Sequence, residues 1–230
     1  MDVTRGRRCP RWVPALVLLA TVGQLALATF ATGLAQFEGK AFGARLVAYP
    51  VLMLLVPLAW WATHRRGLTP TPWGAFALVM APFLIDVSGN TLDLYDSVDW
   101  WDDANHFVNW SLLCGGLGML VLQRIAEPWV RTLLVTGLGA VLAIAWEVAE
   151  WWTFIRHGTE LGTAYTDTLG DEVLGTAGAL VAGLLLSRRA GSVTPGPVTP
   201  GPVTPGPVTS GPVTPGPGAP GGPSGSRRGR

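Results

Sequence analysis

The sequence predicts an all-α fold: a polytopic transmembrane bundle of six helices followed by a disordered tail. The composition is the first reason, because 49% of the 230 residues are hydrophobic and only 13% are charged, whereas a soluble domain carries about 25% charged residues. The second reason is that the apolar residues fall into long stretches with few charges. The third is that basic and acidic residues gather on opposite sides of those stretches, as they do around membrane spans.

Each apolar stretch can form a helix that crosses a bilayer, which takes about 20 residues at 1.5 Å of rise per residue. The expected helices cover residues 12–35, 46–63, 73–95, 104–124, 129–152 and 165–187. The first has an alternative interpretation as a cleaved signal peptide, because it ends in the small residues of "ATFATGLAQ". The 26 uncharged residues between Arg11 and Glu38 exceed a usual signal core and favour a retained helix.

The basic residues orient the predicted helices. Thirteen of the sixteen Lys and Arg residues lie before the first helix, after the second, between the fourth and fifth, or after the sixth. Only Lys40, Arg45 and Arg156 fall on the other side. Since positively charged loops stay in the cytoplasm, we expect both termini to be cytoplasmic. Thirteen of the fifteen acidic residues then lie in outer loops or in the outer halves of helices.

Three regions are expected along the chain. Residues 1–11 form a basic cytoplasmic N-terminus, residues 12–189 the transmembrane domain, and residues 190–230 a cytoplasmic tail. In the tail "VTPGP" recurs with a period of five, a composition that cannot build an apolar core and favours a flexible, partly polyproline-II chain. Docking of a protein partner that reads proline-rich segments is the alternative. No nucleic-acid partner is expected, because topology and anionic lipid explain the terminal arginines.

Three of the apolar stretches are too short to cross a bilayer without carrying acidic residues inward. One is the third predicted helix, whose outer half carries Asp86 and Asn90. Fifteen residues separate Arg131 from Glu147, and fifteen separate Glu172 from Arg188. Such a segment spans about 22 Å, against about 30 Å of hydrocarbon. Charged side chains at that depth are tolerated where they face the interior of a bundle and find partners. We therefore expect these helices to bring their acidic residues together.

The spacing of the polar residues supports a shared site. Residues i, i+4 and i+7 lie on one face of a helix. That spacing, or its i, i+3 equivalent, recurs near the outer end of each of the last four predicted helices. The residues are Asp86, Asn90 and Asp93; Asp102, His106 and Asn109; Glu147 and Glu150; Asp167 and Asp171.

Three motifs between residues 86 and 179 are similar to a known family. They are "DVSGNTLDLYDSVDWWDDANHF", "WEVAEWW" and "YTDTLGDEVLGTAGA", in this order. Together they resemble the YjdF-like family of bacterial inner-membrane proteins, over about residues 40–187. The last motif also resembles, more weakly, the acidic helix of VanZ-like membrane proteins. The resemblance implies a multi-pass protein of the bacterial inner membrane and carries no established activity. The polar positions that it implies are Asp86, Asn90, Tyr95, Asp96, Asp103, His106, Glu147, Glu150, Tyr165, Asp167 and Asp171.

The leading hypothesis is a metal site that opens to the outer face. Carboxylates with one histidine suit Mg²⁺, Mn²⁺, Zn²⁺ or iron, and helix bundles build such sites from carboxylates on facing helices. We expect one or two divalent ions. The expected ligands are Asp86, His106, Glu147, Glu150, Asp167 and Asp171. The expected supporting residues are Asn90, Tyr95, Asp102, Asp103, Asn109 and Tyr165, of which Asp102 or Asp103 would orient His106.

The chemistry at such a site stays open at the level of sequence. A metal near the membrane surface could activate water or polarise an oxygen of a lipid or lipid-linked headgroup, yet no His-Glu-x-x-His motif marks an enzyme. Intramembrane acids and a histidine also suit a proton- or cation-coupled transporter, although no internal repeat is visible. A non-catalytic membrane scaffold is the third interpretation, because topology alone places acids at outer helix ends.

Overall fold

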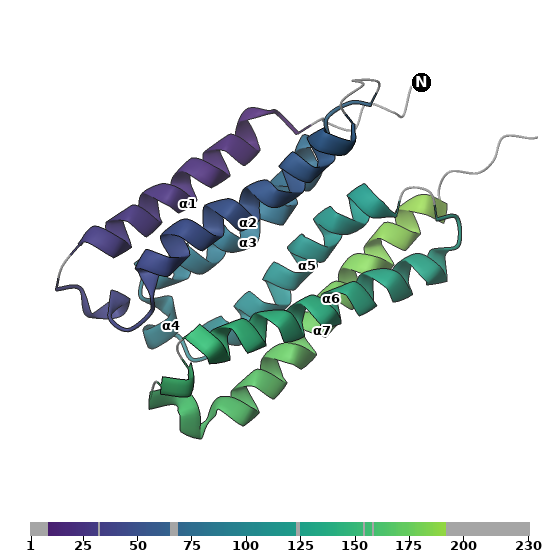
Figure 1. Cartoon of the computed structure of the whole chain (residues 1–230). Helices are drawn as coiled ribbons and strands as arrows, with labels where there is room; N and C mark the ends of the chain where they lie inside the picture. Colours follow the sequence, from purple (N-terminus) through teal and green to yellow (C-terminus); the bar gives the residue numbers. More distant parts are fainter. Residues whose placement is uncertain are drawn as a thin grey trace, which may run out of the picture. The chain divides into compact units, whose positions relative to one another are not determined.

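The structure, a computed structural model, consists of helices. It describes residues 9–31, 33–64, 69–122, 125–153, 155–157 and 159–191, and within these residues every regular element is helical, which confirms the all-α prediction. The long helices are α1 (Trp12–Phe30), α2 (Phe42–Thr63), α3 (Trp73–Thr91), α5 (Trp101–Val121), α6 (Pro128–Thr153) and α7 (Ala164–Gly191), drawn in Figure 1. The short ones are η1 (Ala35–Phe37), α4 (Leu94–Ser97), η2 (Ile155–His157) and η3 (Thr159–Gly162). Residues 1–8 and 192–230, which hold most of the predicted N-terminal segment and tail, lie outside the described residues.

Five of the described helices are long and apolar enough to cross a membrane, namely α1, α2, α3, α6 and α7 up to Arg188. The six predicted stretches correspond to the six long helices, but α5 is not among these five. Its first turns carry Asn105, His106 and Asn109, which lower its hydropathy. Helix α5 is nevertheless 21 residues long and packs against both α3 and α7.

Helix α3 ends earlier than the sequence predicts. It stops at Thr91, and Asp93 follows in a turn with a φ of 59°. Aspartate tolerates this left-handed conformation because its short polar side chain can hydrogen-bond locally. The expectation that Asp93 continues the helix face of Asp86 is therefore wrong. The turn instead lets α4 place Tyr95 against Gly89 of α3, where a Cβ would leave no room for the ring.

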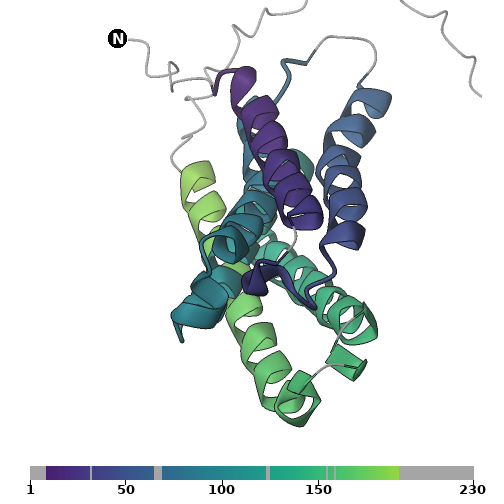
Figure 2. The same ribbon diagram turned by 90° about the vertical axis from the view of Figure 1, so that its left-hand side faces the viewer.

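The ends of the long helices fall into two sets, because successive long helices run in opposite directions (Figures 1 and 2). At one end, the start of α3 is the common neighbour. The start of α1, the end of α2 and the end of α5 all lie beside it. The start of α6 meets the end of α7 there. The neighbouring pairs are Cys9 and Gly74, Trp61 and Trp73, Ala75 and Gly116, and Thr132 and Ser187. Arg11, Arg131 and Arg188 belong to this basic end.

Two clusters of buried side chains hold the helices together. One cluster joins α5, α6 and α7 through Trp110, Cys114, Val135, Ala143 and Ala179, with Leu122 and Ala182. The other joins α1, η1, α2 and α3 through Leu25, Ala28, Phe37, Phe42, Tyr49 and Val87. Trp146 of α6 packs against both clusters and so connects them.

Small residues let α7 approach α5 closely. A Cβ at Gly178 would overlap the carbonyl oxygen of Phe107, and the Ser111 hydroxyl donates a hydrogen bond to the Gly178 carbonyl at 3.0 Å. In lipid, such close approach stabilises a helix pair through van der Waals contact. Asp171 lies two turns before Gly178 on the same helix, so this packing carries its carboxylate toward His106.

Candidate functional site

The acidic end of the bundle, opposite the basic end, contains a cavity of about 350 Å³. Five helices contribute to its wall: α2, α3, α5, α6 and α7, together with α4. The carboxylates that line it are Asp86, Asp96, Asp102, Glu150, Asp167 and Asp171, and the basic side chains are Lys40, Arg45 and His106. A cavity of this size accommodates a small molecule or a lipid headgroup.

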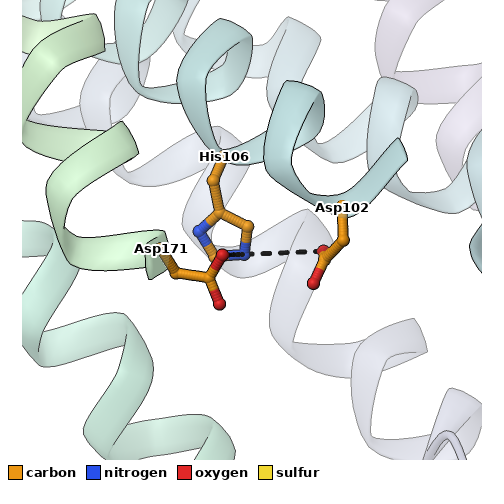
Figure 3. A group of neighbouring side chains, drawn as sticks. All are labelled: Asp102, His106 and Asp171. Atoms are coloured by element: carbon orange, nitrogen blue, oxygen red, sulfur yellow. Dashed lines mark ion pairs between the residues drawn. The ribbon is translucent and has the colours of Figure 1, made fainter. Parts of the chain in front are cut away.

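His106 lies between carboxylates that come from three helices. Its Nε2 is 3.7 Å from an Asp102 oxygen and 3.7 Å from an Asp171 oxygen, and its Nδ1 is 3.9 Å from Glu147 Oε1. Figure 3 shows Asp102 of α5 and Asp171 of α7 directed toward the ring. The distances are too long for hydrogen bonds. They suit donor atoms arranged around a shared cation.

Two groups of donor atoms in the described residues could hold a metal ion, and His106 belongs to both. One group adds Asp102 and Asp171, and the other adds Glu147 and Glu150. Within each group the donor atoms lie within 4.8 Å of one another. Two ligands that are each about 2.1 Å from a zinc ion are at most about 4.2 Å apart. Small side-chain movements would therefore close either group around an ion.

Glu147 supplies a second observation that points to a bound cation or proton. The residue is only 5% exposed, and among the described residues no donor reaches its buried Oε1. A carboxylate oxygen that is buried without a donor is destabilising. Asp171, which faces the other ring nitrogen, is only 4% exposed. A positive charge beside His106 would compensate both residues.

The opposite wall of the cavity is built around Asp86. Its carboxylate accepts hydrogen bonds from Tyr49 Oη at 2.6 Å and from Tyr95 Oη at 2.8 Å, and it pairs with Arg45 Nη1 at 3.2 Å. Near the rim, Lys40 Nζ lies 2.7 Å from an Asp96 oxygen. The charges of both aspartates are thus compensated within the protein, whereas the buried Oε1 of Glu147 beside His106 accepts no hydrogen bond from the described residues.

A directed chain of hydrogen bonds runs from Asp86 into α5. Tyr95 donates to Asp86, Asn105 Nδ2 donates to Tyr95 Oη, and Asn109 Nδ2 donates to Asn105 Oδ1 at 2.7 Å. Burial and the neighbouring Asp86 carboxylate raise the pKa of Tyr95 far above its ordinary value of 10.0, so the phenol stays a donor. At the end of the chain Asn109 Oδ1 is buried and accepts no hydrogen bond from the described residues.

The sequence-predicted residues divide into three sets in the structure. His106, Glu147, Glu150 and Asp171 come together, and the supporting residue Asp102 joins them as a donor. The residues that line the same cavity outside the two donor groups are Asp86, Asn90, Tyr95, Asn109 and Asp167.

Two predicted supporting residues lie elsewhere. Tyr165 is 82% exposed, and Asp103 is exposed and does not line the cavity. Of the two aspartates considered for orienting His106, the structure brings Asp102 to its ring.

Sequence reasoning included Tyr95 but missed the other two partners of Asp86, Arg45 and Tyr49. Arg45 and Tyr49 of α2 line the cavity, and the prediction began this helix at residue 46. A signal was present, because Lys40 and Arg45 are two of the three basic residues on the acidic side of the chain. A cation there is the expected partner for a buried acid. Sequence reasoning also missed Asn105, which links Tyr95 to Asn109 by hydrogen bonds, because several other polar residues surround it at the start of α5.

Comparison with known proteins identifies a family for the chain. The model of a family described as predicted membrane protein (DUF2238) matches residues 15–192, which include all the long helices except the first three residues of α1. No curated protein and no solved structure matches the chain.

Proposed function

Because the chain belongs to the family of predicted membrane proteins DUF2238, we propose that it binds a divalent cation at an outward-facing carboxylate–histidine site in the bacterial inner membrane. In this proposal α5 is a sixth membrane span beside the five apolar helices. Support comes from its 21 residues and its packing against α3 and α7. The narrower likeness to the YjdF-like family fits the same topology.

The proposed orientation places both termini in the cytoplasm. Arg11, Arg131 and Arg188 gather at the basic end of the bundle, and the cavity with its six carboxylates lies at the other end. Basic loops are retained in the cytoplasm, which makes the cavity face outward. In the same proposal α1 is a retained helix, a view supported by Leu25, which is fully buried in the cluster shared with α2 and α3.

The observation that carries the metal proposal is the enclosure of one imidazole by carboxylates at both ring nitrogens. A neutral histidine has a single N–H, so it can satisfy a carboxylate on one side only. We assign the ion to Nε2, with Asp102 and Asp171 as the other ligands. Glu147 then accepts the Nδ1 proton and fixes the ring, as outer partners of metal-bound histidines do.

The bound cation would serve the chemistry of a lipid or lipid-linked headgroup at the outer membrane surface. A divalent ion in such a site polarises a headgroup oxygen or lowers the pKa of a bound water. The remaining residues of the cavity wall would hold the headgroup near it. Docking of a protein partner to the proline-rich tail is a separate expectation that the site does not require.

The test is the metal content of the purified full-length protein and two neighbouring variants. We expect about one equivalent of metal per chain by elemental analysis, an anomalous scattering peak beside His106, and loss of the metal in Asp102→Asn. Asp103→Asn is the matched control, because it removes the same charge one residue away from an exposed position. Glu147→Gln keeps an acceptor for Nδ1 and should weaken binding by about 10–100-fold.

Two outcomes would count against the proposal. One is a protein without stoichiometric metal whose thermal stability is unchanged by a chelator. The other is equal metal loss in Asp102→Asn and Asp103→Asn, which would mean that general negative charge attracts the ion. Cation-dependent flux in proteoliposomes would then favour a transporter, and an inert, impermeable protein would favour a scaffold.

A further inference from the structure

The cavity has two chemically different parts. Its polar part lies at the acidic end of the bundle, around His106, Asp86 and Glu150, and its apolar part is lined by Pro82, Phe83, Trp110, Leu113 and Trp146. Pro82 precedes Asp86 by one turn on α3, and Trp110 and Leu113 follow His106 by one and two turns on α5. At 1.5 Å of rise per residue the apolar part lies about 6–10 Å deeper along the bundle. An amphiphile matches this arrangement of surfaces.

The apolar part adjoins the seam between α2 and α6. Helix α2 packs against α1 and α3, and α6 packs against α7 and α5. Across the seam the rings of Tyr49 and Trp146 lie 6.3 Å apart between centroids, and both line the cavity. A hydrocarbon chain that left the cavity beside these rings would enter the surrounding lipid without crossing a polar surface.

The charge of the polar part selects the headgroup. Among the described residues the lining contains six carboxylates and two permanent cations, an excess of four negative charges. One divalent ion balances two of them, so the wall still favours a cationic group. Asn109 lines this wall, and its buried Oδ1 accepts no hydrogen bond from the described residues, so a ligand that donates one would be stabilised there. A primary ammonium group is both a cation and a donor of three hydrogen bonds.

We propose that the cavity binds one phospholipid with a primary ammonium headgroup, whose acyl chain lies over Trp110, Leu113 and Trp146 and leaves between α2 and α6. This inference rests on the proposed function, because it names the substrate class of the same site. The ammonium group lies among Glu150, Asp167 and Asn109. The phosphate lies beside the cation held at His106, which then meets a headgroup oxygen as the proposed function requires.

The experiment measures lipid retained by the full-length protein after transfer from defined vesicles, by native mass spectrometry. Three vesicle types contain phosphatidylethanolamine, phosphatidylcholine or phosphatidylglycerol. We expect one phosphatidylethanolamine per chain, with at least tenfold lower occupancy by the other two lipids. Phosphatidylcholine has the positive charge without the donors, and phosphatidylglycerol has donors without the positive charge. Equal retention of all three lipids, or a preference for either of the other two, would overturn the proposal.

Two pairs of variants test the placement. Leu113→Trp fills the apolar part and should abolish retention, while Val108→Trp, on the exposed face of the same helix, should not. Asp167→Asn removes one carboxylate of the wall and should reduce the preference for phosphatidylethanolamine by about fivefold. Glu172→Gln, on the same helix and outside the cavity lining, should leave the preference unchanged. Retention by Leu113→Trp equal to that of the unmodified chain would contradict the placement.

Metal content in the same preparations separates this inference from the proposed function. Bound metal without specific lipid retention would overturn the lipid inference and leave the metal site standing. Specific retention of phosphatidylethanolamine in a metal-free protein would overturn the metal site and leave the lipid inference standing. Leu113→Trp should keep its metal, because Leu113 belongs to neither donor group.

Discussion

At the scale of single residues, the role of an acidic side chain depends more on its contact partners than on its residue type. Asp86 and Asp171 both lie in apolar helices near the acidic end of the bundle, and the sequence predicts both as metal ligands. In the structure Asp86 accepts hydrogen bonds from Tyr49 and Tyr95 and pairs with Arg45. Asp171 faces the ring of His106 instead. The same residue type therefore has a structural role in one helix and a candidate ligand role in the other.

The role of Asp86 leads to a stability prediction. Asp86→Asn removes the carboxylate that pairs with Arg45, whose side chain is only 14% exposed. Loss of one partner of a buried ion pair costs about 3–5 kcal/mol. We expect a clear fall in the thermal unfolding temperature of the purified protein in detergent, with the metal content retained, because Asp86 is outside both donor groups.

Asp96→Asn is the matched control for Asp86→Asn. It also breaks an ion pair of the cavity wall, but the Asp96 side chain is 54% exposed, and exposed pairs contribute at most about 1 kcal/mol. Equal stability losses in the two variants would show that burial does not decide the effect. Loss of metal in Asp86→Asn would restore Asp86 as a ligand.

At the scale of helices, contact between α5 and α7 decides whether the donor groups meet. His106 and Asp171 belong to different helices, and the distance between them depends on glycine at the crossing. Gly178→Val introduces a side chain against the Phe107 carbonyl and Ser111. We expect a destabilisation of about 1–3 kcal/mol and at least a tenfold loss of metal affinity, measured by competition with a chelator. Separation of the two helices is the reason for both losses.

Gly137→Ala is the control for this variant. A Cβ at Gly137 meets nothing within 4 Å, and alanine favours a helix by about 1 kcal/mol relative to glycine. Stability should therefore be unchanged or slightly increased, with full metal binding. If Gly178→Val kept its metal affinity, the position of Asp171 would not depend on this crossing.

Whether the protein has a sixth membrane span depends on α5 alone. If α5 crosses the membrane, the loops at its two ends lie on opposite sides. The test uses Asp99→Cys and Glu127→Cys, both at exposed positions, each in a Cys9→Ala background that retains only the buried Cys114. An impermeant maleimide should label Asp99→Cys in intact spheroplasts and Glu127→Cys only after lysis. Labelling of both cysteines on the same side would exclude α5 as a span.

At the scale of the whole molecule, the bundle separates charge along its axis. The described arginines at the starts of α1 and α6 and at the end of α7 lie at one end, and the cavity lies at the other. Two hydrophobic clusters, joined by Trp146, hold the helices on either side of the cavity. In the proposed complex the headgroup lies at the acidic end, near the aqueous surface. The acyl chain lies at the seam between α2 and α6, in contact with the hydrocarbon of the bilayer.

Local patterns in the sequence determined the helical class, the approximate helix positions and most of the polar residues of the cavity, because apolar stretches and i, i+4 spacing depend on near neighbours in the chain. The tertiary structure alone decided which of those residues meet. Arg45 and Tyr49 reach Asp86 across more than thirty positions of chain, and glycine contacts between helices bring Asp171 to His106. Such distances depend on packing between helices, which spacing along a single helix does not encode.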